Sequence, residues 1–164
     1  MLQILKTYFT STTLFLIVNI GIGQNSTYSL TNFSITQTLL PGGQQFEYEY
    51  KNGVLTVYEI FQTGNSITFN HRKKAEYSKN VTKYRIATLD SIINKTNIFQ
   101  FDSIYSEPMI DGVSWTFLFQ VNGLEKNIYL DNYYLAELDP LLTFINSILP
   151  VKKRLITFDF VQKK

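Results

Sequence analysis

The chain has 164 residues, a formal net charge of +2, no cysteine and a single histidine, His71. With 45% hydrophobic and 17% charged residues it has the composition of a globular protein and not of a disordered chain. The lack of cysteine excludes disulfides, thiolate nucleophiles and iron–sulfur clusters, and one histidine excludes a histidine-rich metal centre. We therefore expect no metal and no cofactor, and the small net charge predicts no binding to nucleic acid.

Residues 1–23 have the order of a secretory signal peptide. One positive charge, Lys6, precedes an apolar run, and the run is followed by a small-residue stretch that ends at Gly23. We expect cleavage between Gly23 and Gln24. A membrane anchor is the alternative, but the run is shorter than the roughly 20 apolar residues of a spanning helix. We therefore expect a secreted or periplasmic protein with no membrane span after cleavage.

The signal that ends at Gly23 before Gln24, followed by a body rich in Phe, Tyr, Asn and Lys, resembles the small exported proteins of the Bacteroidota. The resemblance covers the composition and the first 24 residues, and it implies export without indicating a function. Residues 24–43 are rich in Ser, Thr and Asn, and they end in a Pro-Gly-Gly turn signal. We predict an irregular lead-in there, with an edge strand near residues 33–39, and one α+β domain over residues 44–164.

Two Asn-Gly pairs predict hairpins with two-residue type I′ turns. The first, Asn52-Gly53, follows a segment in which apolar and polar residues alternate, and it places Tyr50 opposite Leu55. The second, at residues 122–123, places Phe117 opposite Ile128 and sends Trp115 to the same side. We expect this second hairpin to form the centre of the core. Residues 66–71 and 75–86 are less regular strand candidates on either side of a turn at residues 72–74.

Two helices and a last strand complete the prediction. The first helix starts at Thr88 and ends at Asn97, and the second starts with Asp139 as N-cap and ends at Pro150. Apolar and polar residues alternate again over residues 155–161, which predicts a strand. The order of the elements predicts an α+β fold, a twisted antiparallel sheet built around the two Asn-Gly hairpins with both helices packed on one face.

Candidate site residues are few. A basic group, His71, Arg72, Lys73 and Lys74, is predicted at a loop tip, where it could bind an anionic surface or partner. Lysines also keep edge strands and loops solvated, and we favour that interpretation. No catalytic residue is assigned.

Glu47 and Glu49 form a second candidate pair, on one face of a strand with Thr56 and Tyr58 across from them. Two carboxylates about 7 Å apart suit a glycosidase of the inverting type, although glutamates on a solvated sheet face are far commoner. We expect an exported, non-catalytic binding module, of which an inhibitor or an immunity protein is one kind, for an unknown protein or surface ligand. The competing hypothesis is a small carboxylate-dependent hydrolase.

Overall fold

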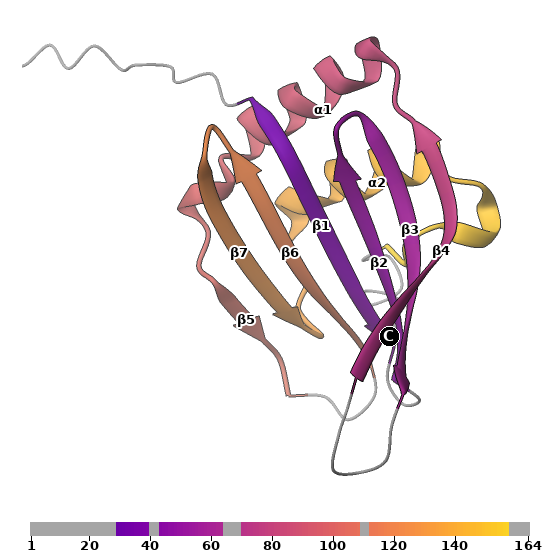
Figure 1. Ribbon diagram of the computed structural model, residues 1–164. Coiled ribbons are helices and arrows are strands. Elements are labelled where there is room, and N and C mark those ends of the chain that lie inside the picture. The colour runs from indigo at the N-terminus through magenta and orange to yellow at the C-terminus, as the bar shows by residue number, and fades with distance from the viewer. Residues whose placement is uncertain (1–28, 40–42, 64–69, 109–111, 158–164) are drawn as a thin grey trace, which may run out of the picture.

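The computed structural model describes residues 29–39, 43–63, 70–108 and 112–157, and these form a single sheet with two helices on one face (Figure 1). The strand order is β4-β3-β2-β1-β6-β7-β5, and all neighbours are antiparallel except β5 and β7. The α+β fold is therefore confirmed. The strands are β1 (Leu30–Leu39), β2 (Gln44–Lys51), β3 (Val54–Thr63), β4 (Asn70–Asn80), β5 (Ile104–Ser106), β6 (Val113–Val121) and β7 (Leu124–Asp131).

Both hairpins have the register that a two-residue turn predicts. Tyr50 opposes Leu55 across β2 and β3, and Phe117 opposes Ile128 across β6 and β7. The turn residues have the positive φ angles of a type I′ turn, 52° and 77° at residues 52 and 53 and 50° and 79° at residues 122 and 123. Trp115 and Phe117 are 0% exposed, so the core lies where the alternation predicted.

The helices α1 (Lys83–Thr96) and α2 (Asp139–Ile148) cover the inner side of this sheet. α2 begins at Asp139, one residue before the predicted start, so Leu138 and not Asp139 is the N-cap residue, and no side chain caps this helix. Asn97, with a φ of 49°, ends α1 as predicted. The predicted strand over residues 75–86 is correct as far as residue 80, where β4 ends, and wrong beyond it, because α1 starts five residues before Thr88. The first turn of α1 is mostly exposed, and it includes Tyr84, so no apolar stripe marks it in the sequence.

Of the lead-in predicted for residues 24–43, the strand near residues 33–39 is confirmed, but it starts earlier than predicted and is central in the sheet. Residues 30–39 form β1, which is no edge strand but lies between β2 and β6, so Ile35 opposes both Tyr48 and Phe117. The domain therefore starts well before residue 44. Gln37 interrupts the polar–apolar alternation of β1 in the sequence. This polar residue lies on the side of the sheet that faces the helices, and it is only 1% exposed.

The predicted turn at residues 72–74 is also absent, since β4 runs through it. Arg72, Lys73 and Lys74 pair with residues 61, 60 and 59 of β3, so the basic group lies on an edge strand and not at a loop tip. Residues 66–69 of the predicted strand lie outside the described residues. Consecutive basic residues are compatible with an edge strand, because their charge discourages pairing with a further strand.

Two side-chain amides hold the chain after the 3₁₀ turn Val151–Lys153. Asn146 donates from Nδ2 to the Leu155 carbonyl (3.0 Å), and its Oδ1 accepts from the Leu155 N–H (2.8 Å). In the same way Gln37 donates from Nε2 to the Ile156 carbonyl (3.1 Å), and its Oε1 accepts from the Ile156 N–H (3.2 Å). The predicted strand is wrong for residues 155–157, since amide side chains replace the strand partner, and residues 158–161 lie outside the described residues.

Replacing Asn146 by Ala should therefore lower the free energy of unfolding by about 1–3 kcal/mol, because the N–H and carbonyl of the buried Leu155 lose both partners. Urea denaturation checks this value. The matched control is Asn127→Ala, which removes an exposed Asn side chain on β7 and should change stability by less than about 0.5 kcal/mol. Equal effects of the two substitutions would show that the amide does not hold the segment.

Candidate functional site

The sheet has an open face, the side that is turned away from α1 and α2 (Figure 1). Side chains alternate along each strand, so the residues between the buried core positions point to this face. On β1 the open-face side chains are polar, and three of them are short: Ser34, Thr36 and Thr38. Next to Ser34, longer side chains lie on both neighbouring strands, Glu49 on β2 and Leu118 on β6.

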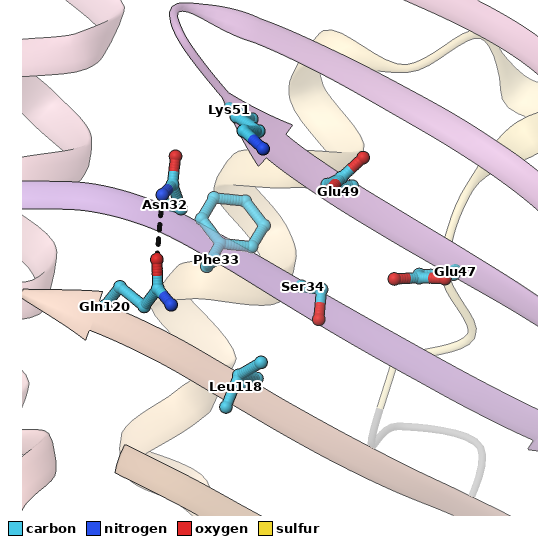
Figure 2. Close-up of a pocket in the computed structure, with 8 residues that line it drawn as sticks. All are labelled: Asn32, Phe33, Ser34, Glu47, Glu49, Lys51, Leu118 and Gln120. Atoms are coloured by element: carbon cyan, nitrogen blue, oxygen red, sulfur yellow. Dashed lines mark hydrogen bonds between the residues drawn. The ribbon is translucent and has the colours of Figure 1, made fainter. Parts of the chain in front are cut away.

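A hollow with a volume of about 220 Å³ lies on this face over β1 (Figure 2). Ser34 lies at its floor, because this residue is opposite Glu49 in β2 and Leu118 in β6 and its side chain is shorter than both. At one end Asn32 Nδ2 donates to Gln120 Oε1 (2.8 Å), which links β1 to β6. The lining residues are Asn32, Phe33, Ser34, Glu47, Glu49, Lys51, Leu118 and Gln120.

Glu47 is the buried carboxylate of the hollow, with 7% of the residue exposed. The ammonium of Lys73 on β4 forms an ion pair with Glu47 Oε2 and lies 5.8 Å from the centre of the Tyr58 ring. Lys73 therefore crosses β3 on the open face to compensate the charge of Glu47. A buried carboxylate without such a partner would be strongly destabilising.

Glu49 has a different environment, although it is two residues away on the same strand. Its Oε2 accepts a hydrogen bond from the Tyr58 hydroxyl (3.2 Å). Burial, followed by the charge and the hydrogen bond of Glu49, raises the pKa of Tyr58, so this hydroxyl keeps its proton and remains a donor. Among the described residues no cation lies within ion-pair distance of Glu49.

The predicted basic group is divided between several roles. Lys73 pairs with Glu47, while Lys74 pairs with Glu76 at 2.8 Å, and Lys153 reaches the same carboxylate at 3.2 Å. These two lysines lower the pKa of Glu76, and Glu76 raises that of Lys74. Arg72 is exposed, and the side chain of His71 lies outside the described part of the structure. Lys73 and Lys74 thus neutralise acidic neighbours, and the binding of an anionic surface or partner by the basic group stays a prediction.

The two glutamates of the hydrolase hypothesis do line one hollow, as their alternation on β2 suggested, and Tyr58 and Thr56 lie opposite them. Both carboxylates belong to the same wall of the hollow, however, because they come from a single strand (Figure 2). The sequence interpretation missed the residues of β1 and β6 that complete the hollow. For β1, the polar–apolar alternation of residues 32–38 could have indicated them.

The ranges that the structure describes contain no group of three or more His, Cys, Asp or Glu side chains placed to hold a metal ion. Neither described helix is long and apolar enough to cross a membrane. A comparison with protein families and with curated protein sequences finds no match to this chain.

Replacing Lys73 by Met should destabilise the protein by about 1–2 kcal/mol, between the effects known for exposed and buried ion pairs, because Glu47 then stays buried without its cation. Thermal and urea denaturation measure this loss. Lys74→Met is the matched control and should cost less, since Glu76 is less buried and keeps Lys153. If the Lys74 substitution proves the more harmful one, Lys73 does not compensate Glu47.

Proposed function

We propose that the protein is an exported, non-catalytic binding module that presents the open face of its sheet to a partner. The hollow over Ser34 is the observation that carries this proposal. It is smaller than the about 300–1,000 Å³ of pockets that enclose a drug-sized ligand, and it lies on a broad polar face. Such a surface suits part of a larger partner, and an inhibitor or immunity-type protein would use it in this way.

A carboxylate-dependent hydrolase has less support. A glycosidase places its two carboxylates on either side of the bond that is cleaved, so that one protonates the leaving group while the other acts from the opposite face. Glu47 and Glu49 stand side by side on one strand, and Glu47 is already neutralised by Lys73. A substrate in the hollow would contact both from the same side.

Export is part of the proposal and rests on residues 1–23. Their charged, apolar and small-residue segments follow the order of a secretory signal, and the absence of cysteine favours a bacterial periplasm or exterior. We therefore place the protein outside the cytoplasm, as in the exported Bacteroidota proteins that its composition resembles. The residues that form the open face all follow the proposed cleavage site.

Site-specific photo-crosslinking in the source cells tests the use of the open face. A photoreactive residue in place of Asn127, exposed on the open face, should give a discrete crosslinked product, whereas one in place of Thr143, exposed on α2, should not. Added wild-type protein should compete for the product, and a Ser34→Tyr variant, whose ring fills the hollow, should not. Equal crosslinking from both positions, or from neither, would refute the proposal.

The export prediction is tested separately by N-terminal sequencing of protein recovered from the periplasm or the medium. We expect the mature chain to begin at Gln24, because the small residues before it fit a signal peptidase. A Gly23→Leu variant should be processed poorly. Recovery of a chain with residues 1–23 intact on membranes would contradict signal cleavage while leaving the binding proposal open to the crosslinking test.

A further inference from the structure

The described part of the open face is acidic, although the whole chain has a net charge of +2. The strand registers place four carboxylates and two lysines on this face, which leaves a net charge of −2. These residues are Glu47, Glu49, Glu125, Asp131, Lys51 and Lys73. An acidic binding face favours a basic partner, because complementary charges accelerate encounter and disfavour acidic competitors.

Glu49, Glu125 and Asp131 of this face have no ion pair among the described residues, and of these three Glu49 lines the hollow, which Lys51 also lines. Lys73 compensates Glu47, whereas the one hydrogen bond that Glu49 receives comes from the neutral hydroxyl of Tyr58. That hydroxyl fixes the carboxylate on the wall of the hollow, and no described cation lies within 4.0 Å of it. A charged hydrogen-bond donor that enters the hollow would therefore find a positioned acceptor.

The hollow also has an apolar side. Leu118 lines it opposite Glu49, so a long side chain can lay its methylene groups along Leu118 while its charged end reaches the carboxylate. Lysine and arginine are the side chains with this combination of apolar stem and cationic end. A volume of about 220 Å³ is on the scale of one such group and not of a large free ligand.

Exposed apolar residues continue on the same face beyond the hollow, towards β5. Ile104 and Tyr129 pair across β5 and β7, and they are 69% and 38% exposed. A polypeptide anchored at Glu49 can extend across β1 and β6 to cover them, whereas a small free cation cannot. A metal ion is disfavoured, because the described residues provide no three-ligand group and hard cations require about six oxygens.

We infer that the open face binds a basic polypeptide segment and that the hollow receives one arginine or lysine side chain of it, which pairs with Glu49. This inference rests on the proposed use of the open face and adds the chemistry of the partner. Glu49 is the specificity-determining residue, Leu118 contacts the side-chain stem, and Ile104 and Tyr129 contact the neighbouring residues of the partner.

A titration with two capped tripeptides, acetyl-Leu-Arg-Leu-amide and the same peptide with neutral citrulline, tests the inference on isotope-labelled mature protein by amide NMR. The arginine peptide should shift the amide signals of Ser34, Glu49 and Gln120, and the citrulline peptide should bind about tenfold more weakly, because it lacks the charge that strengthens the hydrogen bond. Citrulline keeps the shape of arginine. The comparison therefore isolates the positive charge.

Glu49→Gln should reduce the affinity for the arginine peptide by about tenfold and abolish its preference over citrulline, while Gln still accepts from Tyr58 and preserves the fold. Glu137→Gln, which removes the same charge from an exposed position outside the sheet, should leave both affinities unchanged. Equal binding of the two peptides, an unaltered Glu49→Gln variant or no shift at the hollow would overturn the inference. If the photo-crosslinking from position 127 still gave a partner after such a result, the proposed binding function would stand. Only the pairing of Glu49 with an arginine or lysine side chain would then be excluded.

Discussion

The pairing of β1 with two other strands is the interaction on which the rest of the structure depends. Its Ile35 opposes Tyr48 of β2 and Phe117 of β6, and both neighbours are buried. Without β1 the sheet would separate into a β4-β3-β2 part and a β6-β7-β5 part, each with a new edge. The hollow over Ser34 and the contact of Gln37 with the C-terminal segment also belong to this strand.

Sequence reasoning succeeded where the structure is determined locally. A two-residue Asn-Gly turn leaves one register for each hairpin, so Tyr50 and Phe117 had predictable partners. It failed for the central place of β1, because the second partner of this strand, β6, is distant in the sequence. The buried Gln37 also resembles a surface residue until its contacts with Ile156 are known. Both the place of β1 in the sheet and the burial of Gln37 depend on tertiary contacts, which the local sequence does not show.

The same distinction applies to the candidate site. Alternation on β2 was enough to place Glu47 and Glu49 on one face, but the hollow needs Ser34 and Leu118, which reach Glu49 only through the sheet order. The sequence also does not show that Lys73, one of the predicted basic residues, reaches across β3 and pairs with Glu47. A charged residue in the sequence can be neutralised by an ion pair in the folded protein, as Lys73 is by Glu47.

The contacts between Gln37 and Ile156 have a consequence for synthesis, because they join residues 119 positions apart. A chain that emerges N-terminus first forms β1 early, but β6 follows about half a chain later and Ile156 near the end. Contacts at such separations form late and slowly. A stalled or shortened chain would therefore keep one edge of β1 unpaired, and such an edge is what chaperones protect and what leads to aggregation.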